Sequence, residues 1–289
     1  MDIERLRRID RRWIFLLMAA GVWIPLLFRP VITVKPSPIV AAIFEKIESL
    51  PEGSKVLLSF DYGPSTVPEN QPMAEAIARH VLHRRLKLYM VAAWATGQAQ
   101  AEQCIESVIR TDFEDRVYGE DWVHLGYKAG NQGMINAILG GIRNLYTTDV
   151  AGKSVDEIPM MRDVQGLRDM SLIVDIGSGL PGVKEWIQFA GDPGNIPVAG
   201  GVTAVEALLL YPYYPRQLLG LMGGLQGAAE YEAALVEKYP EYLTDSKALT
   251  IMGPQYVAHL LIVVLIVLGN VAFFAQKRRD DRTRKGRAG

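Results

Sequence analysis

The longest apolar stretch of the chain lies near its C-terminal end, from Tyr256 to Ala275. These 20 residues contain no Lys, Arg, Asp or Glu, and a basic cluster follows at 277–279. A helix of this length spans about 30 Å, which is the thickness of the hydrocarbon core of a bilayer. A helix that is apolar on every side and stops at basic residues is typical of a membrane span. We therefore expect a transmembrane helix over 256–275.

A second apolar run extends from Trp13 to Phe28. It is shorter, about 24 Å as a helix, and Trp13 and Trp23 are of a type that favours the membrane interface. The alternative is a secretory signal peptide, because basic residues precede a short apolar stretch. No small-x-small cleavage site follows the run, which is continued by Arg29-Pro30. We therefore expect an uncleaved transmembrane helix over 13–28.

The charges of the chain are strongly segregated, although its net charge is only −1. Residues 1–12 contain five Arg and residues 277–289 contain seven Lys or Arg, whereas the stretch between them has 19 basic against 27 acidic residues. Basic residues next to spans favour the cytoplasm, so we expect cytoplasmic tails at 1–12 and 276–289. The segment 29–255 would then be an extracytoplasmic domain at the cell membrane. Its acidic character, without an Arg/Lys-aromatic cluster, argues against nucleic acid as a partner.

Between the two spans, apolar segments alternate with amphipathic ones. Strands that are apolar throughout and separated by helices are typical of a parallel sheet covered on both faces. The predicted fold class is α/β: a doubly wound, mostly parallel sheet of about five strands, flanked by N- and C-terminal transmembrane helices. The predicted strands are Lys55–Gly63, Leu86–Trp94, Asp121–Tyr127, Met170–Gly179 and Asn195–Gly201. The predicted helices are Ile39–Leu50, with Ser37 as its cap, Glu69–Arg85, Gly97–Arg110, Asn131–Leu145 and Val183–Ala190.

The segment 215–238 is rich in glycine and predicts a helix with a face of small residues. Glycine within a helix costs about 1 kcal/mol relative to alanine, so several together indicate that another backbone approaches closely. That backbone could belong to the protein's own sheet, or to a second subunit, another membrane protein or the membrane surface. The helix-packing candidates lie three and four positions apart, and they are Gly220, Gly223, Gly224 and Gly227.

Polar and glycine residues follow all five predicted strands. In open α/β sheets, ligands bind beyond the carboxyl ends of the strands, although turn chemistry alone also favours such residues there. We expect Asp61 and Asp175 to face one another at this edge, where paired carboxyls can share a proton. Neither a metal site nor a cofactor is predicted. The candidate ligand-binding residues are Asp61, Ser65, Thr66, Lys128, Asn131, Asp175, Ser178 and Thr203.

The segment Gly177–Gly182, GSGLPG, matches the Gly-x-Gly-x-x-Gly pattern of dinucleotide sites. It follows the fourth predicted strand instead of the first, and no acid ends the next strand to hold a ribose. We therefore favour a tight, anion-tolerant turn over a dinucleotide site.

Other reactive side chains have simpler interpretations. His80 and His83 adjoin two arginines, so we predict a solvated helix end instead of a metal site. Cys104, the single cysteine, is predicted to be buried in a helix. The sequence contains no Gly-x-Ser-x-Gly, Walker or His-Glu-x-x-His motif.

These observations favour a membrane-anchored, non-enzymatic protein whose domain binds a ligand or a partner protein within an oligomer or membrane complex. The expected partners are the bilayer, a second copy of the chain or another membrane protein, and a small molecule. The alternative is a membrane-anchored hydrolase or transferase with its site around Asp61, Ser65, Lys128 and Asp175. A crevice that is open at the strand ends would favour a ligand, and a filled one with an exposed glycine face would favour assembly.

Overall fold

The computed structural model describes residues 10–28 and 34–287. The chain divides into two compact units, one of which, Thr33–Leu249, contains the sheet. The other consists of Met1–Ile32 and Thr250–Gly289 and contains two long apolar helices.

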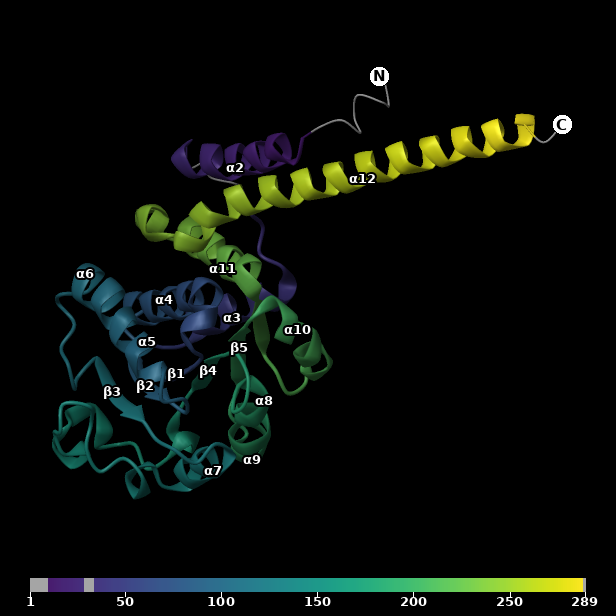
Figure 1. Cartoon of the computed structure of the whole chain (residues 1–289). Coiled ribbons are helices and arrows are strands. Elements are labelled where there is room, and N and C mark those ends of the chain that lie inside the picture. Colours follow the sequence, from purple (N-terminus) through teal and green to yellow (C-terminus); the bar gives the residue numbers. More distant parts are fainter. Residues whose placement is uncertain (1–9, 29–33, 288–289) are drawn as a thin grey trace. The chain divides into compact units, whose positions relative to one another are not determined.

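The sheet has six strands in the order β3-β2-β1-β4-β5-β6 (Figure 1). All five strand pairings are parallel. This order is that of the doubly wound, Rossmann-like sheet, so the predicted α/β class is confirmed. The strands are β1 (Lys55–Asp61), β2 (Lys87–Ala92), β3 (Trp122–Tyr127), β4 (Leu172–Gly177), β5 (Val198–Val202) and β6 (Gly220–Gly223).

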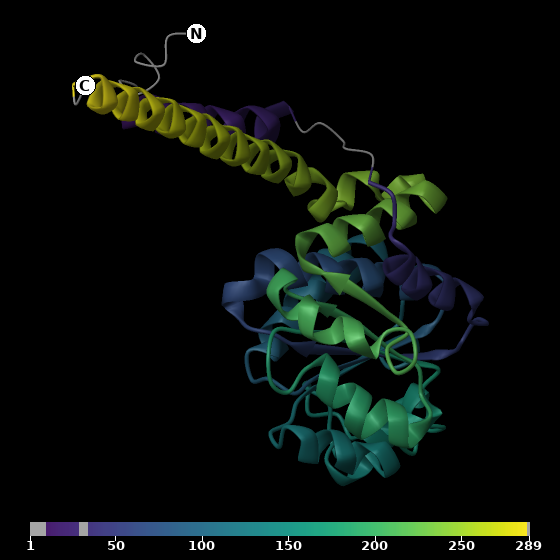
Figure 2. The same cartoon turned by 90° about the vertical axis from the view of Figure 1, so that its right-hand side faces the viewer.

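Helices cover both faces of the sheet, so strands such as β4 and β5 are buried along their whole length (Figures 1 and 2). One face is covered by α3 (Pro38–Ser49), α4 (Val67–His83), α5 (Gly97–Cys104) and α11 (Gly224–Lys238). α5 continues through a π-turn at Ile105–Ile109 into α6 (Arg110–Asp112). The core of the other face is formed with α7 (Gln132–Gly140), α8 (Val183–Trp186) and α10 (Ala204–Leu210), and α9 (Asp192–Gly194) extends α8 through a π-turn at Ile187–Gly191.

The glycine-rich segment does not form the single helix predicted over 215–238. Gly220 and Gly223 lie in the edge strand β6, and α11 begins only at Gly224. Gly224 has φ +62°, a left-handed conformation that favours glycine and turns the chain from strand to helix. Gly220 lies against Ile43 of α3, and Gly227 lies against the backbone of β6. The four glycines thus contact their own domain, and the small-residue helix face predicted from them does not exist.

The sixth strand, β6, was not predicted from the sequence either. A short apolar run flanked by glycines has no periodicity that separates a buried strand from a buried helix. The other predicted elements agree with the structure to within a few residues, except that the helix predicted to end at Leu145 ends at Gly140.

The side chain of Ser37 does not cap the following helix as predicted. It is the N-cap residue of α3, but its side chain makes no capping bond. Instead its hydroxyl donates to Glu230 of α11, and its backbone N–H donates to the same carboxylate at 2.9 Å. Ser37 therefore ties α3 to α11.

His80 is buried, which contradicts the predicted solvated helix end. Burial lowers the pKa of His80 to about 4, so the imidazole is neutral at pH 7. Its Nε2 donates to Glu48 at 3.0 Å, and its Nδ1 accepts from the Tyr231 hydroxyl at 2.6 Å. Glu48 also pairs with Lys238 at 2.6 Å. The prediction failed because α3 and α11 cover this end of α4, and the sequence gives no sign of that cover.

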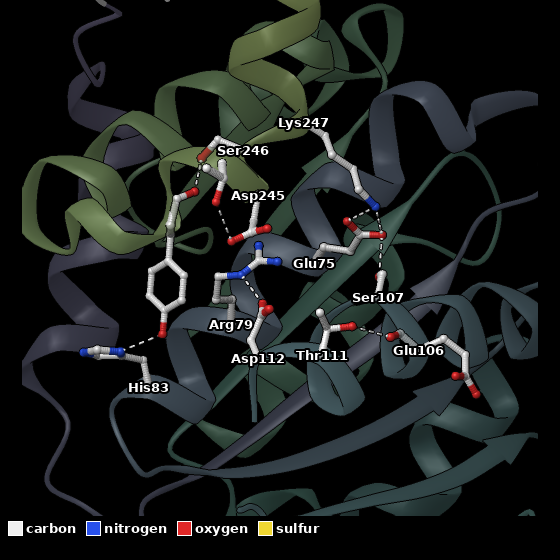
Figure 3. A network of polar contacts seen from close by, with 12 residues as sticks. Glu75, Arg79, His83, Glu106, Ser107, Thr111, Asp112, Asp245, Ser246 and Lys247 are labelled. Carbon is white, nitrogen blue, oxygen red and sulfur yellow. Dashed lines mark hydrogen bonds and ion pairs between the residues drawn. The ribbon is translucent and has the colours of Figure 1, made fainter. Parts of the chain in front are cut away.

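A network of carboxylates fixes the first turn of α12 (Lys247–Arg287) to the domain (Figure 3). The Lys247 ammonium lies 2.6 Å from the buried Glu75 carboxylate of α4, which also accepts from Ser107 at 2.8 Å. Glu232 of α11 accepts the Leu249 backbone N–H at 2.9 Å. Carboxylates at a helix N-terminus satisfy free N–H groups and interact well with the helix dipole.

The terminal unit contains α2 (Arg11–Phe28) and most of α12. The stretches Arg11–Phe28 and Lys247–Arg278 are both long and apolar enough to cross a membrane. They include the two spans predicted over 13–28 and 256–275. Length and composition therefore allow two membrane-spanning helices in this chain.

Candidate ligand site at the carboxyl edge of the sheet

The strand order reverses between β1 and β4, which is where doubly wound sheets open a crevice beyond their carboxyl ends. β1 ends at Asp61, and β4 carries Asp175 near its end. Asp61 pairs in register with Gly177, and Ser59 pairs with Asp175. Because side chains alternate along a strand, both carboxyls leave the sheet on the same face. Each carboxyl shifts the pKa of the other, so the two aspartates lie close together.

Asp61 is surrounded by hydrogen-bond donors. Its Oδ1 accepts from the Ala93 backbone N–H at 2.6 Å. Its Oδ2 accepts from the Ser59 hydroxyl at 2.9 Å and from the Trp186 indole N–H at 2.8 Å. Burial raises the pKa of Asp61, but these donors oppose that rise because each of them stabilises the charged form. Asp61 is therefore the ionised member of the pair.

Asp175 has the opposite surroundings. It is fully buried, and neither of its oxygens accepts a hydrogen bond from a donor group in the described part of the chain. Burial, followed by the charge of Asp61, raises the pKa of Asp175 well above its ordinary value. Two adjacent buried carboxyls cannot both ionise. Asp175 therefore holds the proton and donates it to Asp61, and the pair carries one negative charge.

The space directly above the two carboxyls is closed. Trp94, after β2, donates its indole N–H to the Pro181 carbonyl at 2.8 Å. The Trp94 ring also lies against Gly179. The loop after β4 is thereby held over the point where the strand order reverses, and Asp61 and Asp175 are both fully buried. The open hollow lies beside this closed region, beyond the ends of β4 and β5.

That hollow is a pocket of about 610 Å³ between the loop after β4 and helix α10. Its polar lining includes Ser178 and Thr203, which are two of the predicted ligand-binding residues. The remaining lining combines charged and apolar side chains, and consists of Gly179, Leu180, Lys184, Glu185, Val205, Glu206, Leu209, Leu210 and Tyr213. A concave, largely apolar site with a few polar groups is the usual form of a small-molecule site.

Two acids line this pocket. Glu185 of α8 accepts the Gly182 backbone N–H at 3.0 Å. Glu206 of α10 reaches toward the same loop, within 4 Å of where a β-carbon of Gly182 would lie. Burial and the charge of Glu185 raise the pKa of Glu206 to about 6. Both acids also raise the pKa of Asp175, so the charges in the pocket interact with the buried pair.

The other predicted ligand-binding residues lie outside the pocket lining. Ser65 and Thr66 belong to a short 3₁₀ turn after β1, where the Thr66 hydroxyl donates to the Gly63 carbonyl. The Lys128 ammonium lies 5.5 Å from the centroid of the Tyr146 ring. Asn131 is exposed at the start of α7, with φ +49°.

Sequence reasoning missed the acidic and apolar sides of the pocket. One signal was available: Thr203-x-x-Glu206 matches the capping box that opens many helices. In the structure Thr203 is the N-cap residue of α10 but makes no capping bond, and Glu69 of α4 accepts the Ala204 N–H at 2.9 Å instead. Glu206 is therefore left to face the pocket.

The glycines of the GSGLPG turn serve close packing within the domain. A β-carbon at Gly177 would lie 2.9 Å from Asp175 Oδ2, and one at Gly179 would lie 3.1 Å from the Trp94 ring. A β-carbon at Gly182 would collide with the Gly179 carbonyl. The surrounding acids repel phosphate, so this turn lacks the electrostatics of a dinucleotide site.

No protein-family model matches the chain, and no curated protein matches it. Among solved structures, the chain is similar to trehalose-6-phosphate synthase OtsA, with 14% sequence identity and a TM-score of 0.28. The match covers 82% of this chain and 47% of the synthase, so the chain spans about half the length of that protein.

Proposed function

We propose that this chain is a membrane-anchored ligand-binding protein. Its α/β domain lies outside the cytoplasm and binds a small molecule in the pocket between the loop after β4 and α10. The observation that carries the proposal is this pocket of about 610 Å³, beside the buried Asp61–Asp175 pair where the strand order reverses. Ligands of doubly wound sheets bind beyond the carboxyl ends of the strands, and this pocket lies beyond the ends of β4 and β5.

The membrane anchoring is supported by the two long apolar helices, α2 and α12. The proposed topology has both ends in the cytoplasm, because the basic excess lies outside the two spans. The bilayer is therefore one partner, and the small molecule is another.

Binding is favoured over the hydrolase or transferase alternative by the state of the residues that would act. Asp61 already accepts bonds from Ala93, Ser59 and Trp186, and Asp175 is closed off from solvent. A general acid or base has to reach the proton that it transfers. The buried pair is better suited to set the charge behind the pocket than to touch a substrate.

The test is whether a compound co-purifies with the full chain in a manner that depends on the pocket. Leu209 lines the pocket and Leu208 does not, although both are exposed on α10. Leu209→Trp should fill the pocket, while Leu208→Trp is the matched control. We expect mass spectrometry of the denatured proteins to find a compound in wild type and Leu208→Trp that is lost in Leu209→Trp. The same compounds in all three proteins would argue against the pocket.

A further inference from the structure

Part of the pocket lining is apolar and open to solvent. On α10, Val205 is 82% exposed and Leu209 is 73% exposed. Leu180, in the loop opposite, is 75% exposed. All three line the same pocket. Large apolar side chains gathered in the open around a pocket indicate a site that receives an apolar group.

The lining also carries negative charge that no ion pair in the described ranges neutralises. Within the described ranges, Glu206 has no hydrogen-bond or ion-pair partner, and Glu185 accepts only the Gly182 N–H. Their charges also raise the pKa of the buried Asp175 behind them. Carboxylates that are partly removed from water without a cation are costly, and a bound cation would remove that cost.

Lys184 also lines the pocket but does not supply this cation. It is exposed, and it forms no ion pair with Glu185 or Glu206 in the described structure. No three His, Cys, Asp or Glu side chains among the described residues converge as ligands of a metal ion. The missing positive charge is therefore better supplied by an organic cation, whose apolar part can also contact the apolar lining.

We infer that the pocket binds an amphiphilic organic cation, with its amine between Glu206 and Glu185 and its apolar part against α10. This inference rests on the proposed ligand-binding function and adds the chemical class of the ligand. An ammonium group donates charge-assisted hydrogen bonds to carboxylates, which are about twice as strong as neutral ones. Phosphates and carboxylates of similar size are repelled by the same acids.

Three probes with the same six-carbon chain and different head groups test the inference: hexylammonium, 1-hexanol and hexanoate. Each is titrated calorimetrically into the full chain in phosphatidylcholine nanodiscs at about pH 7.5, where an amine is charged and Glu206 is ionised. Empty nanodiscs provide the blank for partition into lipid. We expect saturable binding of hexylammonium, roughly ten-fold weaker binding of 1-hexanol and no binding of hexanoate.

Three variants test whether binding depends on the charge of Glu206 and on the apolar lining of the pocket. Glu206→Gln keeps the shape and removes the charge, and it should weaken hexylammonium binding roughly ten-fold. Leu209→Ser should also weaken it, whereas Leu208→Ser, at an exposed position outside the pocket lining, should not. Melting temperatures equal to that of wild type would show that the variants are folded.

The outcomes distinguish failure of the cationic ligand class from failure of the proposed ligand-binding function. Equal binding of the three probes, or no effect of Glu206→Gln, would overturn the cationic class while leaving the pocket as a ligand site. If no probe binds saturably, and no co-purifying compound is lost in Leu209→Trp, both the inference and the proposed function fail.

Discussion

Asp175 holds the proton of the buried Asp61–Asp175 pair at the point where the strand order of the sheet reverses. The two residues have the same side chain and opposite surroundings: Asp61 has three donors, whereas Asp175 has none besides its own proton. Neither residue is free to act on a substrate. Their shared negative charge instead sits behind a pocket that already contains two acids.

Asparagine substitutions at the pair should have unequal effects. Asp175→Asn keeps a donor toward Asp61, so we expect little change in the free energy of unfolding. Asp61→Asn brings an amide that cannot accept from all of the donors Ala93, Ser59 and Trp186 as the carboxylate does. Leaving such buried donors unpaired should cost about 1–3 kcal/mol. Denaturant unfolding of the two variants measures the difference, and equal destabilisation would contradict the assignment of the proton to Asp175.

Stability should fall as pH rises from about 4.5 to about 7 because of Glu232. Burial raises the pKa of Glu232 from 4.5 to about 7. A carboxyl whose pKa is raised on folding binds more protons in the folded state, so its contribution is full below pH 4.5 and is lost by about pH 7. Glu232→Gln keeps an acceptor for the Leu249 N–H and should flatten this part of the profile. A profile from melting temperatures that Glu232→Gln leaves unchanged would contradict this prediction.

Gly224→Leu should weaken the fold without changing the size of the assembly. Gly224 has φ +62°, and a β-carbon there would lie 2.8 Å from the Ala204 β-carbon. The left-handed conformation should cost about 1–2 kcal/mol and the overpacking about 1–3 kcal/mol. Gln226→Leu, at an exposed position of α11, is the control. Size-exclusion chromatography that showed a smaller particle for folded Gly224→Leu would instead support the predicted contact with a partner.

The proposed topology can be tested by thiol labelling of intact cells. The single cysteine, Cys104, is fully buried and burial raises the pKa of its thiol, so background labelling should be low. A membrane-impermeant maleimide should label Ala151→Cys, an exposed position of the domain. Ala288→Cys, in the C-terminal tail, should react only after the cells are permeabilised. The reverse pattern would place the domain in the cytoplasm.

The sequence was sufficient to predict the class of the fold, because its strands are buried on both faces and therefore apolar throughout. β4 and the helix after it were recognised in this way. β6 was not, since four residues with two glycines have no readable period. His80 was misplaced because its cover comes from α3 and α11, both distant in sequence.

The site was predictable only in part. Residues at strand ends could be found from the polar pattern, which is how Asp61, Asp175, Ser178 and Thr203 were identified. The sequence could not show that Trp94 closes the space above the two aspartates. Glu206 and Leu209 lie on a helix, where an acid and an exposed leucine look like ordinary surface residues until the neighbouring loop is placed opposite them.

Hydrogen–deuterium exchange of the full chain in nanodiscs, with and without hexylammonium, shows whether a cation binds in this pocket. We expect slower exchange in two segments, 178–186 and 203–213, which together line the pocket. Exchange in 36–45, on the other face of the domain, should not change. Protection that is absent from both pocket segments, or that appears in 36–45 instead, would contradict the assignment of this pocket as the ligand site.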